Sequence, residues 1–283
     1  MSDTTSPTGA THDAHRARQE RLLERLLALL VADPRVLGVI AGGSYARGAN
    51  DAFSDLDLHC YLRDEERTGR EEIHRAVAAL GPTLSVLYTY DRNGLYLYDD
   101  GVRLDLDYLP PSAIATRVQG GTTILLDPDG VLARDLGSVH RHEHRVHPRW
   151  WEPGDPAYVT WFLWMFRQVY AWTKRGAQGG DRALAKLTSA ADSIHQTRTS
   201  LTELRLWTLD QPYNLAAADP ALADALAQTY PHLTPDELLG ATRALLAAYE
   251  RVCPDYCAKA GVAYPVEKVV ALHRVLDELD RLS

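Results

Sequence analysis

The chain has 283 residues, of which 46% are hydrophobic and 24% are charged, and its formal net charge is -8 at pH 7. This composition is typical of a water-soluble globular protein, and the length suffices for one large domain or two ordinary ones. The acidic balance argues against binding along a nucleic-acid backbone, which requires a basic surface, and it is compatible with a small cationic substrate.

The cysteines and the apolar runs indicate the compartment. Three cysteines, Cys60, Cys253 and Cys257, form an odd set without paired spacing, which argues against a disulfide framework. The most apolar run, residues 159–166, is too short to cross a bilayer. Since no secretory signal is recognisable either, we expect a cytoplasmic protein without a membrane partner.

The N-terminal part begins with a polar stretch and continues as a helix and a strand. Residues 1–16 are small and polar, which predicts a disordered tail in which His15 has no role. Residues 17–31 place leucines at helical spacing, which predicts an amphipathic helix. The apolar run of residues 36–41 predicts a short buried strand.

A glycine-serine turn follows this strand. Gly42 and Gly43 allow the backbone to turn sharply and a ligand to approach closely. Ser44 is expected to cap a short helix that ends near Arg47. A helix N-terminus with a hydroxyl and an arginine nearby suits an anion, so Gly43, Ser44 and Arg47 are candidate phosphate-binding residues. Taken alone, such a segment is most often only a turn.

Two carboxylates come directly after the turn. Asp55 and Asp57 alternate with Leu56 and Leu58, which predicts a strand with one buried face and both carboxylates on the other. Along a strand the two aspartates lie roughly 6 to 7 Å apart. Like charges this close repel each other unless a cation lies between them, and Mg²⁺ suits such a site. The alternative is an ordinary solvated strand face.

Further elements complete a small domain around a mixed sheet. A helix is predicted for residues 71–80, and strands for residues 84–90, 95–98, 102–109 and 122–126. Asn93 and Gly94 are predicted to form the hairpin turn between two of these strands. On residues 102–109 the side chains of Arg103, Asp105 and Asp107 share the polar face.

The composition changes after this domain. Residues 137–151 contain His140, His142, His144 and His147, interleaved with Arg141, Arg145 and Arg149. Alternating histidines could bind a metal, but alternating arginines disfavour a cation, so an interdomain linker is the better interpretation. A lesser alternative is that some of these arginines contact nucleotide phosphates.

The C-terminal part is predicted to be helical throughout. Helices are expected at residues 158–174, 181–209, 220–229, 235–252 and 266–282. The first is rich in aromatic residues, which we interpret mainly as core, with lining of an acceptor site or a dimer interface as alternatives.

The predicted fold class is therefore α+β, with an N-terminal mixed sheet flanked by helices and a C-terminal helical bundle. The expected boundaries are a tail at 1–16, a catalytic domain at 17–136, a linker at 137–155 and the bundle at 156–283.

The turn and the aspartates together resemble the nucleotidyltransferase superfamily typified by DNA polymerase beta. The pattern of that family is Gly-Ser, then Asp-x-Asp, then a third carboxylate on a neighbouring strand. Gly43 and Ser44 match the first part, and Asp55 and Asp57 match the second. The third aspartate of the family often follows an Arg-apolar pair, which favours Asp105, with Asp107 as the alternative.

The resemblance implies a mechanism. Mg²⁺ held by Asp55 and Asp57 would bridge the nucleotide phosphates, while Gly43 and Ser44 would hold the leaving pyrophosphate. Asp105 would complete the metal site or accept the proton of an attacking hydroxyl. In the aminoglycoside enzymes a separate glutamate can act as general base, for which Glu143 is a candidate here. Arg47 and His59 lie close to the site and are candidates to contact phosphates or a metal-bound water, and for His59 a structural role is at least as well supported.

The layout of a catalytic domain followed by a helical bundle resembles the lincosamide and aminoglycoside nucleotidyltransferases. It implies transfer of a nucleoside monophosphate, AMP from ATP, to a hydroxyl of a small and cationic molecule, and a homodimer. The alternatives are a nucleotidyltransferase that modifies a protein or RNA, and a non-catalytic nucleotide-binding protein.

Overall fold

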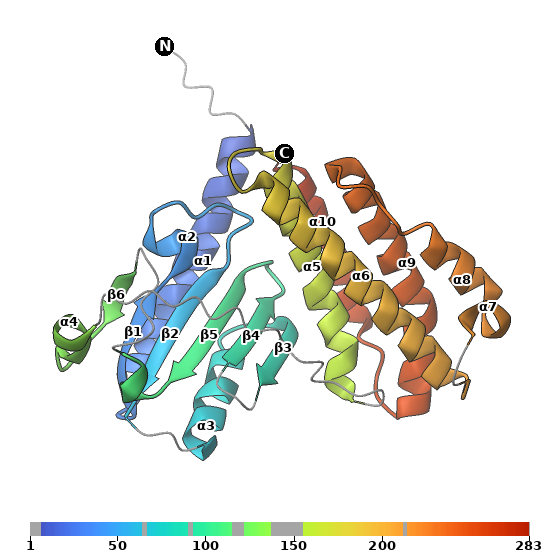
Figure 1. The fold of residues 1–283 in the computed structure, drawn as a ribbon. Helices are drawn as coiled ribbons and strands as arrows, with labels where there is room; N and C mark the ends of the chain where they lie inside the picture. The colour runs from blue at the N-terminus through green and yellow to red at the C-terminus, as the bar shows by residue number, and fades with distance from the viewer. Residues whose placement is uncertain are drawn as a thin grey trace, which may run out of the picture. The chain divides into compact units, whose positions relative to one another are not determined.

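The computed structural model describes residues 7–63, 67–89, 93–114, 122–136, 155–211 and 214–282. The chain divides into two compact units, residues 1–150 with Leu282 and residues 151–281 with Ser283. The first contains a sheet with helices, and the described part of the second is helical (Figure 1). The predicted α+β class is therefore confirmed. Most of the predicted linker, with its four histidines and Glu143, lies outside the described residues.

The first unit is built around six strands. Its elements are α1 (Pro7–Val31), β1 (Val36–Ala41), α2 (Gly43–Ala46), β2 (Leu56–Leu62), α3 (Arg67–Ala78), β3 (Thr83–Thr89), β4 (Asn93–Tyr98), β5 (Arg103–Leu109), the 3-10 turn η1 (Pro111–Ala113), β6 (Thr123–Leu126) and α4 (Val131–Asp135). The strand order is β3-β4-β5-β2-β1-β6. The pair β2 and β5 is parallel, and the other neighbouring pairs are antiparallel, so the sheet is mixed as predicted.

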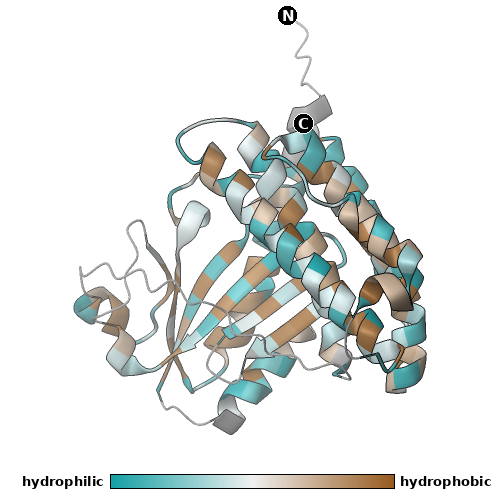
Figure 2. Cartoon of the chain, turned by 45° about the vertical axis from the view of Figure 1, so that its right-hand side comes forward, coloured by the Kyte–Doolittle hydropathy of each residue, from teal (hydrophilic) through white to brown (hydrophobic). Residues whose placement is uncertain are grey.

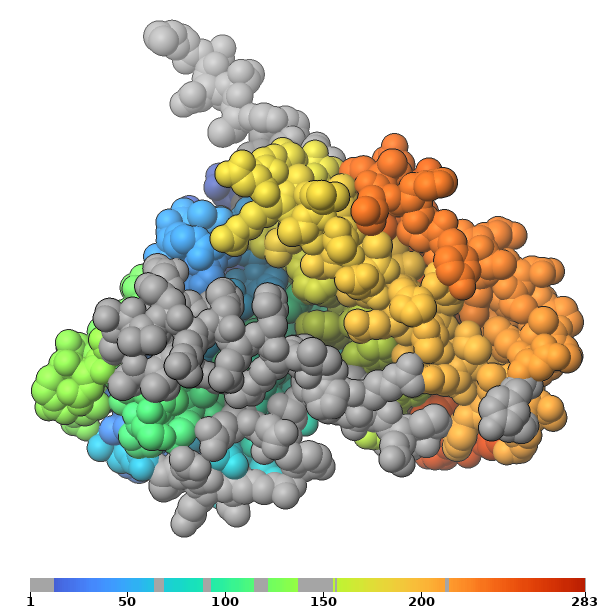
Figure 3. Space-filling view, in the orientation of Figure 1, coloured from blue at the N-terminus to red at the C-terminus, as the bar shows by residue number. Residues whose placement is uncertain are grey.

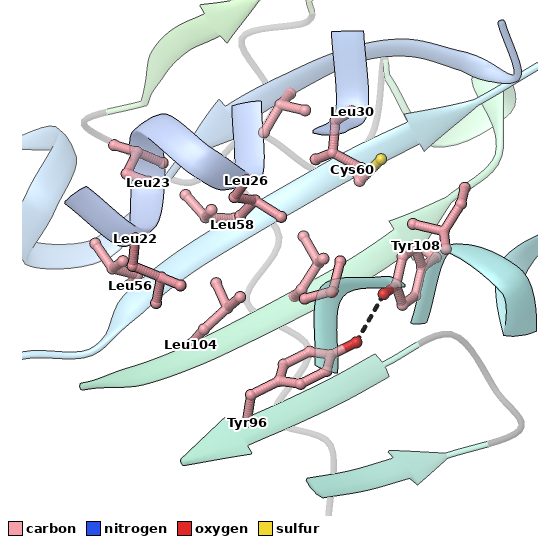
Figure 4. Close-up of a cluster of buried hydrophobic side chains, with 14 of the residues drawn as sticks. Leu22, Leu23, Leu26, Leu30, Leu56, Leu58, Cys60, Tyr96, Leu104 and Tyr108 are labelled. Carbon is pink, nitrogen blue, oxygen red and sulfur yellow. Dashed lines mark hydrogen bonds between the residues drawn. The ribbon is translucent and has the colours of Figure 1, made fainter. Parts of the chain in front are cut away.

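The two faces of the sheet differ in polarity. Figure 2 shows hydrophobic and hydrophilic residues alternating along the strands, the pattern of strands whose successive side chains point to opposite faces. On the apolar face Leu56, Leu58 and Leu104 are buried under leucines of α1, as Figure 4 shows. Ile73 of α3 belongs to the same core. The carboxylates of β2 and β5 are left for the opposite face.

A hydrogen-bonded pair of tyrosines crosses this core. The hydroxyl groups of Tyr96 and Tyr108 lie 2.8 Å apart (Figure 4), and that of Tyr96 lies 2.7 Å from Nδ1 of His74. Burial lowers the pKa of His74 to about 4, so its ring is neutral at pH 7 and can accept a hydrogen bond from Tyr96. The buried hydroxyl groups thus have partners, as buried polar atoms require.

Helix α1 begins at Pro7, so the predicted disordered tail is wrong for residues 7–16. His15 and Gln19 are buried, and they extend the stripe formed by Leu22 and Leu26 at helical spacing. The buried His15 therefore continues the amphipathic stripe of this helix, and its Nδ1 lies 3.3 Å from the guanidinium of Arg18.

The predicted hairpin turn at Asn93 and Gly94 is also wrong, because both residues belong to β4 and pair with β3. A Cβ atom added to Gly94 would lie 2.5 Å from the hydroxyl oxygen of Tyr96 and 2.8 Å from carbons of its ring. Glycine is therefore required here by close packing within the sheet, and the side chain of Asn93 is used in a contact with Asp107.

The second unit consists of packed helices. They are α5 (Pro156–Ala177), α6 (Ala183–Thr208), α7 (Leu215–Ala218), α8 (Pro220–Ala227), α9 (Pro235–Ala260) and α10 (Val266–Asp280). Helices α5, α6 and α9 pack against one another, and α10 packs against α5. The rings of Phe162 and Phe166 lie 5.2 and 5.8 Å from that of Tyr249, so the aromatic helix contributes to the core. Side chains of α6 and α8 form part of the surface of this unit (Figure 3).

Helix α9 is longer than predicted. It continues through Pro254 and ends at Gly261, whose φ of 69° is left-handed. The missing N–H of Pro254 removes one helical hydrogen bond. The buried neighbours Cys253, Tyr256 and Cys257 compensate for this loss, because continuation of the helix keeps them in the core. None of the helices in the described part of the chain is long and apolar enough to span a membrane.

Replacing Tyr96 with Phe tests the buried tyrosine pair. The variant leaves the polar atoms of His74 and Tyr108 without this partner, so the free energy of unfolding should fall by about 1–3 kcal/mol. Urea denaturation followed by circular dichroism would measure the change. Tyr230→Phe is the control, because Tyr230 is 69% exposed and its replacement should change stability by less than about 0.5 kcal/mol.

Candidate active site

Three segments meet at one edge of the sheet. Strand β1 ends at Ala41, while β2 begins at Leu56 and β5 at Arg103. Because β2 is antiparallel to β1 and parallel to β5, the turn after β1 lies beside the first residues of both other strands. The register pairs Asp57 with Asp105 directly.

Three carboxylates converge at this edge. Asp55, Asp57 and Asp105 each offer an oxygen atom that lies within 4.8 Å of the other two, and all three residues are partly buried. Carboxylate oxygens in such a group are the ligands that Mg²⁺ prefers. Of the two alternatives on β5, the structure places Asp105 in this cluster. Oδ2 of Asp107 lies instead 3.1 Å from Nδ1 of His59.

Arg103 holds two of these carboxylates, although the sequence analysis assigned it no role. Its buried guanidinium Nη2 lies 3.1 Å from Oδ2 of Asp55 and 3.1 Å from both oxygens of Asp105. Burial raises the pKa of Asp105 to about 6, with a further contribution from Asp55, although the charge of Arg103 opposes the shift. Three ionised carboxylates and one guanidinium leave two negative charges, a deficit that a divalent cation balances.

The glycine turn packs directly on one carboxylate. The backbone N–H of Gly42 donates to the carbonyl oxygen of Asp57 at 2.8 Å. Gly43 has a φ of +60°, and a Cβ atom added to it would lie 2.0 Å from Oδ2 of Asp57. Both the backbone conformation and the contact therefore exclude a side chain at this position. The turn brings free backbone surface to the carboxylate cluster.

The prediction that Ser44 caps a helix is wrong. Helix α2 already begins at Gly43, its N-cap is Gly42, and no side chain makes a capping hydrogen bond. The left-handed conformation of Gly43 starts the helix one residue earlier than the hydroxyl suggested. Ser44 is a half-buried residue of this turn, and Arg47 ends it with an exposed side chain.

The loop before Asp55 is held by buried polar groups that the sequence analysis missed. The side-chain amide of Gln19 on α1 donates to the carbonyl oxygen of Ser54 at 2.9 Å, and it accepts from Asn50 at 3.2 Å. Oδ1 of Asp51 accepts from the hydroxyl of Ser54 at 2.8 Å. The only sequence signal was the place of Gln19 on the buried stripe of α1, where a polar residue requires a partner.

A second polar row lies beside the carboxylates. In the register of the sheet His59 is opposite Asp107, and Asp107 is opposite Asn93. The side-chain amide of Asn93 donates to Oδ1 of Asp107 at 2.9 Å, while His59 occupies the other oxygen. His59, predicted to lie near the site, is thus hydrogen-bonded to Asp107, which is in turn hydrogen-bonded to Asn93.

Comparison with known proteins is consistent with this geometry. Residues 20–94 match the family model described as "Nucleotidyltransferase domain", and this range contains the turn, Asp55 and Asp57. A search of curated proteins found no match.

Several solved structures are similar to the chain at low identity. An aminoglycoside 6-adenyltransferase from Bacillus subtilis is 15% identical, with 92% of this chain and 97% of that chain covered and a TM-score of 0.33. The STING-associated c-di-GMP synthase CdnE from Capnocytophaga granulosa is 9% identical, with 88% and 83% covered and a TM-score of 0.29. The CD-NTase CdnG from Bradyrhizobium diazoefficiens, in complex with GTP, is 12% identical, with 98% and 94% covered and a TM-score of 0.27.

The family match lies on the segment that forms the glycine turn and the first two carboxylates, and β5 adds the third carboxylate beside them. The first unit therefore contains a segment that matches a nucleotidyltransferase domain, and this match supports a nucleotidyltransferase enzyme.

Proposed function

We propose that this protein transfers AMP from ATP to a hydroxyl group of a small molecule and releases pyrophosphate. The observation that carries this proposal is the cluster of Asp55, Asp57 and Asp105 beside the turn at Gly43. The cluster supplies cation ligands and the turn supplies close backbone access, and nucleotidyl transfer requires both at one place.

The carboxylate cluster fits Mg²⁺. Its ligands are oxygen atoms and its net charge is negative, and burial, with a smaller contribution from Asp55, already raises the pKa of Asp105. Asp55, Asp57 and Asp105 would hold the ion. When bound, Mg²⁺ supplies charge neutralisation for the phosphates and the leaving pyrophosphate.

The remaining roles follow from position. Gly43 and Ser44 would hold the pyrophosphate through the backbone of the turn. The exposed side chain of Arg47, at the end of α2, would contact the phosphates. Asp105 completes the metal site, or accepts the proton of the attacking hydroxyl. Arg103 holds Asp55 and Asp105 in place.

The proposed acceptor is a cationic, hydroxylated small molecule, of which aminoglycoside and lincosamide antibiotics are examples. The net charge of -8 supports this class, because a negative field attracts cations. The same charge disfavours RNA as acceptor. The complete carboxylate set disfavours a non-catalytic protein. A cytoplasmic homodimer belongs to the same proposal.

The test of this function is a screen of aminoglycosides, lincosamides and unrelated hydroxylated metabolites with each nucleoside triphosphate and Mg²⁺. Mass spectrometry should detect a nucleoside monophosphate adduct on one acceptor. Asp55→Ala and Asp57→Ala should lower Mg²⁺-dependent pyrophosphate release on the order of 10³-fold, since a metal site contributes several kcal/mol to transition-state stabilisation. Near wild-type rates in these variants would refute the assignment of the metal site.

The two aspartates of β5 should differ in importance. Asp105→Asn is expected to reduce kcat by about 100-fold or more, because Asp105 belongs to the cluster, while Asp107→Asn should reduce it by about 10-fold. Steady-state pyrophosphate release would compare them. A larger loss in Asp107→Asn would mean that the register identifies the wrong carboxylate.

Gly43 and Gly48 offer a matched pair for testing the turn. Their φ angles are +60° and +63°, so alanine should cost each variant about 1 kcal/mol of stability. A Cβ atom at Gly48 meets nothing within 4 Å, whereas at Gly43 it collides with Asp57. Gly43→Ala should therefore lose activity by about 100-fold, because the carboxylate of Asp57 must shift, while Gly48→Ala retains it. Equal activities would show that the turn does not require this close approach.

A further inference from the structure

We propose that His59 is a further residue of the metal site, whose Nε2 accepts a hydrogen bond from a water molecule bound to the divalent cation. Asp107 and Asn93 act as positioning residues that orient its ring. This inference rests on the proposed function, because it requires the cation held by Asp55, Asp57 and Asp105.

The contacts of Asp107 restrict how His59 can lie. Nδ1 of His59 is 3.1 Å from Oδ2 of Asp107, and Nδ2 of Asn93 is 2.9 Å from the other carboxylate oxygen. The side chains of His59 and Asp107 are only 11% and 22% exposed. Both oxygens of Asp107 are thus engaged by groups on the strands at either side of it, β2 and β4.

The same contacts select the tautomer of the histidine. An ionised carboxylate only accepts hydrogen bonds, so Nδ1 of His59 must carry the hydrogen that it donates to Asp107. In the neutral ring Nε2 then bears a lone pair and can only accept. In that form Nε2 accepts a hydrogen bond from a donor such as water or a hydroxyl.

The free nitrogen lies beside the glycine turn. A Cβ atom added to Gly42 would be 3.6 Å from Nε2 of His59, and one added to Gly43 would be 2.0 Å from Oδ2 of Asp57. The imidazole and the carboxylate thus border consecutive residues of one turn. Both side chains come from the same face of β2, two residues apart.

A hydrated cation needs acceptors beside it. Mg²⁺ usually keeps several waters in protein sites, and these waters donate hydrogen bonds to nearby acceptors. Nε2 of His59 borders the same glycine turn as the carboxylate of Asp57, which places an acceptor beside the cluster.

Two conservative variants separate this role from a purely structural one. His59→Gln keeps an acceptor near the position of Nε2, and His59→Asn keeps a polar group near the position of Nδ1, beside Asp107. The dissociation constant of Mn²⁺, which prefers oxygen ligands as Mg²⁺ does, is measured from the electron paramagnetic resonance signal of the free ion. The assay uses the full chain without nucleotide, and thermal unfolding without metal reports the fold of each variant.

We expect His59→Asn to weaken Mn²⁺ binding about 10-fold and His59→Gln by less than about 3-fold, the size of effect typical for groups that orient a metal site from its second layer. Equal affinities of the two variants, or tighter binding by His59→Asn, would overturn the inference. Asp55→Ala distinguishes this failure from failure of the proposed function. If wild type binds Mn²⁺ no better than Asp55→Ala, the metal site itself is absent.

Discussion

The repulsion among three carboxylates at one edge of the sheet is the constraint on which the rest of the first unit depends. Asp55, Asp57 and Asp105 have oxygen atoms within 4.8 Å of one another, which is unfavourable for ionised groups without a counter-charge. The buried guanidinium of Arg103 compensates for part of this repulsion by contacting two of them. A divalent cation would compensate for the remainder, so the uncompensated negative charge at this edge of the sheet favours cation binding.

Holding these anions together requires a rigid surrounding. The apolar face of β2 and β5 packs against α1 and α3, which fixes the strands in register. A slip of one residue would turn the carboxylates into the core, so burial of one face determines where the other face presents its charges. Gln19 reaches from α1 to the carbonyl oxygen of Ser54, and the core helix thereby also restrains the loop that carries Asp55.

The glycine turn and the polar row of His59, Asp107 and Asn93 are likewise explained by contacts between neighbouring segments. Gly43 has no side chain because Asp57 occupies the space where a Cβ atom would lie. His59 is oriented by Asp107, and Asp107 by Asn93, across three neighbouring strands. In both places the residue type is explained by the side chain that it contacts, which is Asp57 for Gly43 and Asp107 for His59. The second unit contributes its own aromatic core, in which α5 packs against α6 and α9.

The sequence by itself determined the local features of this protein. Period-two alternation located β2 and β5 and placed their aspartates on one face, and helical spacing located α1 and the helices of the second unit. The family pattern favoured Asp105 over Asp107, but only the parallel register of two strands that are distant in the chain brings Asp105 beside Asp57. The roles of Arg103, Gln19 and Asn93 depend likewise on partners far away in sequence. Burial of His15 on α1 and the close packing of Gly94 against Tyr96 in β4 are tertiary contacts, and they outweighed local preferences for a polar tail and a tight turn.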